Sequence, residues 1–147
     1  ASRTILIQEE VHVERYYNRK YQTHHWTLSS AEMNSLRRPN DWLYEGRAFK
    51  AYPARLEQCP KGTEPVWRLR KKSEHQFFFT KSRVEKNHLE ESPHWMAEGI
   101  GFCIPSKDKA SVYRLVHKTS GKHMFTRSRV EKEALMKQGW HYEGKAF

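Results

Sequence analysis

The chain has 147 residues, a formal net charge of +10 and 13% aromatic residues. This is the length of one ordinary domain with a single core. No apolar run approaches the roughly 18 residues that a membrane-spanning helix needs, so we expect no membrane span. The positive charge predicts attraction to an anionic partner, such as a phosphate-rich polymer, a nucleic acid or an acidic surface, without choosing among them.

The first ten residues, ASRTILIQEE, lack the basic and long apolar regions of a secretory signal peptide. If the protein is exported, the sequence is therefore a piece of a longer mature chain. Ile5 and Ile7 alternate with other residues in a way that indicates a strand, which we place at residues 3–13. Our hypothesis is that this strand supplies a piece that the end of the chain lacks and so closes a pseudo-threefold ring.

One pattern occurs three times, over residues 13–49, 66–102 and 112–147. Internal similarity at a period of about 45 to 53 residues indicates repeated units that bury their apolar faces against one another. We therefore expect one domain, residues 1–147, built from three units. The recurring residues are Arg15, Arg68 and Arg114; Thr27, Thr80 and Thr126; Ser29, Ser82 and Ser128; Glu32, Glu85 and Glu131; Leu36, Leu89 and Leu135; Trp42, Trp95 and Trp140; Glu45, Glu98 and Glu143; and Phe49, Phe102 and Phe147.

Each copy predicts the same order of elements. A short run rich in β-branched and aromatic residues is followed by a turn and by a second, aromatic strand, HHWT, FFFT or HMFT, which together make a hairpin. A short helix and a third strand with alternating Trp, Tyr and Ala come next, and a glycine in that strand indicates a bulge. The fold class that we predict is α+β and β-dominated, with three ββαβ repeats in a pseudo-threefold single domain.

The helix starts carry the clearest local pattern, Ser-x-x-Glu, in all three copies. In such a capping box the serine oxygen binds the helix N-terminus and the glutamate reaches back to the serine amide. We therefore interpret Glu32, Glu85 and Glu131 as capping residues. The recurring arginines 15, 68 and 114 are open to two interpretations: three ligand sites for carboxylate or phosphate, or ion pairs that fix how the units dock. We favour the ion pairs.

The two cysteines are Cys59, in the first connector, and Cys103, directly after the second repeat. They fit a single disulfide in an exported domain, which we favour, or two buried thiols. A zinc site is not expected because there is no CxxC motif. The nine histidines form no HExxH or HxH pattern, and neighbours such as His24 and His25 point to opposite faces of a strand.

No catalytic motif is present among those we sought, which include GxSxG, the P-loop and GxGxxG. We therefore expect a protein that is not an enzyme and that carries neither a metal nor a cofactor. Residues that differ among the copies are better candidates for recognition than residues that recur.

The first copy mixes aromatic rings with basic donors around its hairpin turn. Such a mixture suits a sugar ring that carries anionic groups, because aromatic faces stack on the ring while Arg and Lys bind the charges. It would equally suit single-stranded nucleic acid, and a solvated basic turn is a third interpretation. The candidate ligand-binding residues are Tyr16, Tyr17, Arg19, Lys20, Tyr21, His25 and Trp26, with Arg70 from the corresponding turn of the second copy.

The pattern VYRL, G-x-H-x-FT, S-x-x-E-x-x-x-L and GW-x-YEG-x-AF resembles a repeat family of exported bacterial proteins, often found beside peptidoglycan hydrolase or peptidase domains. Residues 112–147 match throughout; the second copy departs at Phe77 and Ser92-Pro93, and the first has Trp26 in place of Phe. The arrangement is also similar to the target-recognition domains of zoocin A-like streptococcal bacteriolysins.

The resemblance implies a noncatalytic, secreted module that binds cell-wall peptidoglycan or an anionic wall polymer. Such a module would target an attached lytic enzyme to Gram-positive, streptococcal cells, and we expect it to be monomeric. The alternatives are a glycan-binding adhesin or lectin-like module, and a basic nucleic-acid-binding domain. A disulfide would count against nucleic acid, because oxidised cysteines fit an exported protein better than a cytosolic one.

Overall fold

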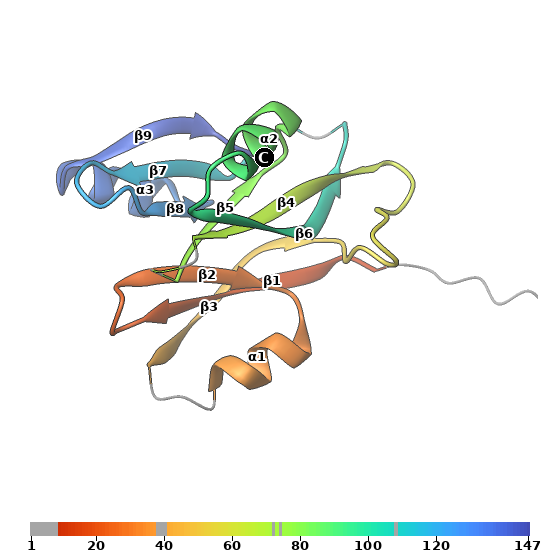
Figure 1. Ribbon diagram of the computed structural model, residues 1–147, viewed down its shortest axis with the longest axis horizontal. Coiled ribbons are helices and arrows are strands. Elements are labelled where there is room, and N and C mark those ends of the chain that lie inside the picture. The colour runs from red at the N-terminus through yellow and green to blue at the C-terminus, as the bar shows by residue number, and fades with distance from the viewer. Residues whose placement is uncertain (1–8, 38–40, 72, 74, 108) are drawn as a thin grey trace, which may run out of the picture.

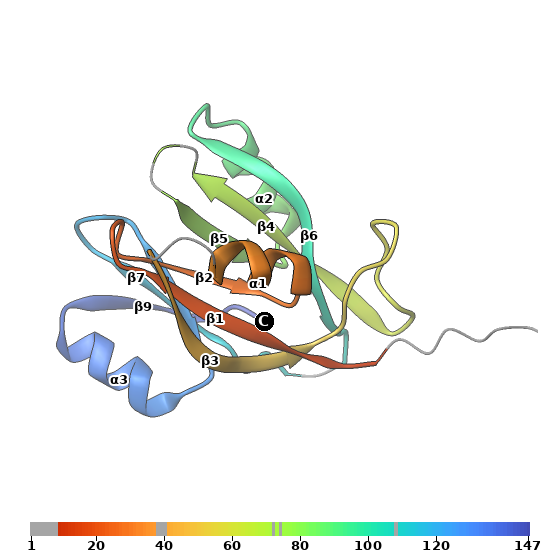
Figure 2. The same cartoon turned by 90° about the horizontal axis from the view of Figure 1, so that it is seen from below.

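The computed structural model describes residues 9–37, 41–71, 73, 75–107 and 109–147. Within them the chain forms three three-stranded antiparallel sheets, each with one short helix, which is the predicted β-dominated α+β fold (Figure 1). The first unit contains β1 (Val11–Asn18), β2 (Thr23–Thr27), α1 (Ser30–Arg37) and β3 (Trp42–Ala51); the second contains β4 (Thr63–Lys71), β5 (Gln76–Thr80), α2 (Arg83–Glu90) and β6 (Trp95–Pro105); the third contains β7 (Tyr113–His117), β8 (His123–Thr126), α3 (Arg129–Lys137) and β9 (Trp140–Lys145). The helices lie on the outside of the three sheets (Figure 2).

The first strand of each unit is the centre of its sheet, with strand orders β2-β1-β3, β5-β4-β6 and β8-β7-β9. The third strand of each unit bulges where glycine was expected to interrupt it. Gly46, Gly99 and Gly144 have φ angles of +96°, +83° and +97°, a conformation that a residue with a side chain rarely adopts. The ladder between β1 and β3 shifts its register next to Arg15, opposite Gly46, and the ladder of the third unit shifts next to Arg114.

The helix starts confirm one half of the predicted capping box. The serine oxygens of Ser29, Ser82 and Ser128 accept the backbone N–H three residues later at 3.2, 3.1 and 3.0 Å. The other half was wrong, because the serine amides donate to the threonine hydroxyls that close the second strands, at 3.0 to 3.1 Å. The glutamate carboxylates are thus available to bind a stronger partner than a backbone amide, an arginine of the neighbouring unit.

A ring of ion pairs joins the units. Arg15 binds Glu131 of the third unit through two bonds of 2.7 and 2.9 Å. Arg68 binds Glu32 of the first unit at 2.8 Å, and Arg114 binds the corresponding glutamate of the second unit at the same distance. Each arginine also binds a glutamate of its own unit, at 2.9 to 3.1 Å. The recurring arginines therefore fix how the units dock, as favoured from the sequence.

The core is shared by the three units as two layers of aromatic rings. Trp26, Phe79 and Phe125 meet with centroids 5.2 to 5.8 Å apart and planes 84° to 88° to one another. A second triangle, from Phe49, Phe102 and Phe147, has centroids 5.3 to 5.6 Å apart. Each triangle takes one ring from each unit, so the two triangles define a pseudo-threefold axis through a single core.

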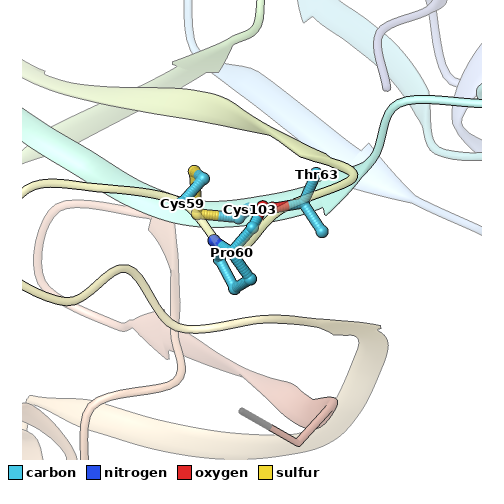
Figure 3. Close-up of a disulfide and its surroundings, with 4 residues drawn as sticks. All are labelled: Cys59, Pro60, Thr63 and Cys103. Carbon is cyan, nitrogen blue, oxygen red and sulfur yellow. Dashed lines mark hydrogen bonds between the residues drawn. A yellow bond between two sulfur atoms is a disulfide. The ribbon is translucent and has the colours of Figure 1, made fainter. Parts of the chain in front are cut away.

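The predicted disulfide between Cys59 and Cys103 is present, which rules out two free thiols (Figure 3). It ties the first connector to β6, and a pair of backbone bonds between Tyr52 and Cys103, at 2.7 and 2.8 Å, lies beside it. The bond therefore strengthens the junction between the first and second units.

The hypothesis about the N-terminal strand falls mostly on residues 1–8, which lie outside the described part of the chain. The third unit has a closure of its own, because the carbonyl of Phe147 accepts the amides of Ser111 and Val112 at 2.9 and 2.8 Å. None of the helices in the described residues is long and apolar enough to cross a membrane.

Candidate functional site

A hollow of about 330 Å³ opens where the hairpins of the three units meet. The strands β1, β4 and β7 all run toward this side of the molecule (Figure 2). The second strand of each unit lines the hollow with residues at equivalent positions. The outer wall of the hollow comes from the third unit. We call this hollow the axial pocket. Its residues are Tyr17, Gln22, Thr23, His24, Gln76, Phe77, His117, Ser120, Lys122, His123, Met124, Leu135, Gln138 and Trp140.

The pocket exists because one of three equivalent junctions is filled less completely than the others. Between the first and second units His25 packs on Phe77 with centroids 3.8 Å apart. Between the second and third units Phe78 packs against His123 at 4.7 Å. At the equivalent place between the third and first units the sequence has Met124, whose thioether replaces a ring. The unbranched side chain leaves space beside Trp140, and the pocket occupies it.

Buried polar groups line the inner part of the pocket. Thr23 is 3% exposed, and its hydroxyl has no hydrogen-bond partner in the described part of the chain. Gln76 is 4% exposed. A buried hydroxyl without a partner costs free energy, so a ligand that bonds Thr23 would recover it.

Histidines and glutamates hold the pocket walls in place. His24 binds Glu45 at 3.0 Å, and His123 binds Glu143 at 3.2 Å. Burial lowers the pKa of His123, even though Glu143 opposes this shift, so the ring is neutral at neutral pH. Tyr17 packs against His24 with centroids 4.8 Å apart, and Trp140 packs against His117 at 5.1 Å. Two aromatic rings held by neighbours thus face a cavity with polar groups inside.

The hairpin turns place positive charge around the pocket mouth. Arg19 and Lys20 of the first turn and Lys118 of the third are exposed. The ammonium group of Lys122 donates to the carbonyl of Tyr21 at 2.8 Å, which connects the third unit to the first. Lys122 lines the pocket itself, and the other three cations lie at the hairpin turns beside it.

The eight residues proposed from the sequence fall into different places. Tyr17 lines the axial pocket. Arg19, Lys20 and Tyr21 lie at the neighbouring turn, where the Tyr21 ring stacks on His75 with centroids 4.2 Å apart and Lys20 lies over it. Four of the eight residues, Tyr17 and the three at the turn, therefore lie near one another.

Tyr16, His25 and Trp26 lie in the interior, each only 1% exposed, and offer no open face to a polymer. His25 and Trp26 are buried because β2 packs against β5 of the second unit, whereas Tyr16, on β1, packs against Tyr44 of its own unit with centroids 5.4 Å apart. Arg70 binds Glu98 at 3.1 Å. In the other two units a histidine makes the corresponding contact, so Arg70 has a structural explanation.

Sequence reasoning missed Thr23, His24, Lys122 and Trp140 as pocket residues. Trp140 recurs in every copy, and recurring residues were considered weaker candidates for recognition than residues that differ. The signal that could have found the site is Met124, where the third copy departs from the aromatic residue of the second. In the described residues no group of three or more His, Cys, Asp or Glu side chains could hold a metal ion.

Residues 10–147 match the model of a family described as a domain of unknown function, DUF5648. No curated protein and no solved structure matches the chain significantly. The function therefore has to be inferred from the geometry of the pocket.

Proposed function

Because the chain belongs to the DUF5648 family, whose description assigns no function, we propose one from the geometry: a noncatalytic module that binds the cell wall of Gram-positive, streptococcal cells and targets an attached lytic enzyme to them. The observation that carries this proposal is the axial pocket, with its aromatic walls, buried hydroxyl and basic mouth. The ligand in the pocket is a sugar of the peptidoglycan.

The pocket has the chemical groups that a saccharide needs. The rings of Tyr17 and Trp140 can pack against the C–H face of a sugar, while Thr23 and Gln76 can bond its hydroxyl or acetamido groups. A volume of about 330 Å³ is at the lower end of the roughly 300 to 1,000 Å³ of small-molecule sites. The pocket therefore suits a small part of a glycan, and the rest of the polymer would lie over the hairpin turns.

Charge and redox chemistry support the same proposal. The net charge of +10 attracts the carboxylates of peptidoglycan and speeds encounter more than it strengthens the final contact. The disulfide is consistent with an extracellular protein, and secretion is part of the proposal. Weak binding of single sugars would be strengthened when many modules meet a polymer with many sites.

The test is sedimentation with purified streptococcal peptidoglycan from which phosphate polymers have been removed, at physiological salt. Wild-type protein should sediment, and soluble muropeptide should compete. Trp140→Ala should weaken binding by about tenfold or more, because one pocket wall is lost.

Trp95→Ala is the matched control, since Trp95 occupies the equivalent place in the second unit and does not line the pocket. It should lose comparable stability and keep wall binding. Failure of the wild type to sediment would end the proposal. Competition by host glycans but not by muropeptide would indicate that the pocket serves an adhesin or lectin-like function instead.

A further inference from the structure

We propose a second binding site at the end of the sheets opposite the axial pocket. This site binds the phosphate groups of an anionic wall polymer that carries no bases. It consists of the cations Arg47, Lys50, Lys81, Lys109 and Arg127, which we call the basic track. This inference rests on the proposed function for the source of the polymer, but the site itself does not depend on the axial pocket. The cell wall would then be bound at two places by different chemistry: a sugar in the axial pocket and phosphate groups on the basic track.

The track follows two adjoining hollows that share Arg127. The larger, of about 530 Å³, is lined by Arg47 and Arg127 at the junction between the third and first units. The smaller, of about 200 Å³, is lined by Lys50, Lys81 and Lys109 together with Arg127. The shared side chain makes the two hollows one continuous surface for a flexible chain.

The register of the first sheet separates the track from the axial pocket. Tyr17 pairs with Leu43 near the pocket, whereas His12 pairs with Lys50 five residues earlier along β1. At about 3.3 Å per residue this is roughly 17 Å along the strand. A single sugar cannot reach both sites, so the track would bind another part of the ligand.

Most of these cations are free to bind a ligand. Lys50, Lys109 and Arg127 form no ion pair with any residue that the structure describes. Lys81 lies 3.4 Å from Glu64, and both side chains are about 40% exposed, so this pair contributes little. Arg47 lies 4.0 Å from Glu14, at the limit of an ion pair, and its side chain is 67% exposed.

Acidic side chains do not cancel the positive charge of the basic track. In the larger hollow, both Glu45 and Glu131 are bound by Arg15 at 2.9 and 2.7 Å. Glu10 is the one acid among the described residues that line the smaller hollow, against four cations. A positive excess remains along the surface.

The scaffold does not require these charges. At the junction between the first and second units, the positions equivalent to Arg47 and Arg127 carry Ile100 and Leu28, and the units still dock. The same ion pair between arginine and helix glutamate holds both junctions. The junction between the second and third units carries Lys81 and Lys145 at these positions, so cations occur there as well. Because the first junction forms without them, docking of the units does not explain the cations, and a binding site does.

The lining of the track favours a phosphodiester polymer without bases over a nucleic acid. Sites for single-stranded nucleic acid combine cations with exposed aromatic rings on which bases stack. The aromatic residues that line the two hollows are Phe49 and Phe147, which are only 5% and 3% exposed. Lysine and arginine remain as binding groups, and they suit phosphate oxygens spaced along a flexible chain.

The experiment is a titration with poly(glycerol phosphate) at several salt concentrations. The triple variant Lys50→Gln, Lys109→Gln, Arg127→Gln should raise Kd by about tenfold or more and make the log–log salt dependence shallower by about two, at roughly 0.7 per lost phosphate contact. The control Arg37→Gln, Arg55→Gln, Lys137→Gln removes the same net charge from exposed positions outside both sites and should change Kd by less than about threefold.

Equal losses in the two triple variants would overturn the proposal, because binding would then reflect net charge alone. So would single-stranded DNA that binds the track more than about tenfold tighter than poly(glycerol phosphate), which would assign the surface to nucleic acid. Trp140→Ala should leave this titration unchanged while it weakens sedimentation with phosphate-free peptidoglycan. Failure of the axial pocket and failure of the track are therefore seen in separate measurements.

Discussion

Two junctions of the ring differ although the same ion pair holds both. Between the first and second units, His25 packs on Phe77, and the disulfide ties the connector between these units to β6. Between the third and first units, Met124 stands where a ring would fill the space, and the axial pocket and the larger hollow of the basic track lie along that junction. The residues that recur build the ring, whereas single departures from the pattern open surfaces on it.

Removal of the disulfide should have the largest effect on stability, because it acts on the junction that is closed most firmly. The bond spans 44 residues of sequence, for which chain entropy predicts a loss of about 4 kcal/mol. Cys59→Ala with Cys103→Ala should therefore lower the free energy of unfolding by about that amount in urea. A loss below about 1 kcal/mol would show that the first junction does not depend on the bond.

Removal of the recurring arginines should come next and should affect the three junctions alike. Arg15→Met, Arg68→Met and Arg114→Met each take the arginine away from a partly buried glutamate, which costs about 2 kcal/mol. Urea unfolding of the three variants measures this directly. If one variant lost several times more unfolding free energy than another, the three junctions would not contribute equally to stability.

Acid should weaken the first junction through Glu32. Burial opposes ionisation of this carboxyl, but its contacts with His25 and Arg68 outweigh burial and lower its pKa from 4.5 to about 2. A lowered pKa contributes stability that is present above pH 4.5 and is lost as the pH falls toward 2. Burial also lowers the pKa of His25, so protonation of the unfolded chain below pH 6.5 acts in the same direction.

Glu32→Gln should therefore flatten the acid limb of a stability profile by about 1.5 kcal/mol between pH 5 and 2. Glu131→Gln is the comparison at the third junction, where burial opposes ionisation but hydrogen bonds from Arg15 and Thr126 lower the pKa, and no described histidine hydrogen-bonds the carboxylate. It should flatten the profile less. An identical profile for Glu32→Gln and wild type would contradict the assignment.

The fold followed from the sequence because its signals are local and occur three times. Serine caps, the glycine bulges and the alternating strands need no knowledge of distant contacts. The pairing of Glu32 with Arg68 could not be read locally, since it depends on which unit docks beside which. The ring of ion pairs was expected in kind, but its glutamates were assigned to the helix caps.

The site was predicted less well, and the reason is burial. Tyr17 and the basic turn were found because they differ among the copies. Tyr16 and Trp26 differ as well, but packing within the first unit and between units buries them, which a strand pattern with one covered face does not reveal. Trp140 was missed because a recurring residue can still line a cavity when a neighbour such as Met124 is smaller than its equivalents.

Met124→Phe separates the axial pocket from the rest of the ring. It should cost less than about 1 kcal/mol in stability, because the equivalent junction already holds Phe78. The new ring should fill the axial pocket beside Trp140. The variant should keep its melting temperature within a few degrees and keep its binding to poly(glycerol phosphate), but it should no longer sediment with phosphate-free peptidoglycan. Undiminished sedimentation of a folded Met124→Phe protein would contradict the proposed role of the axial pocket.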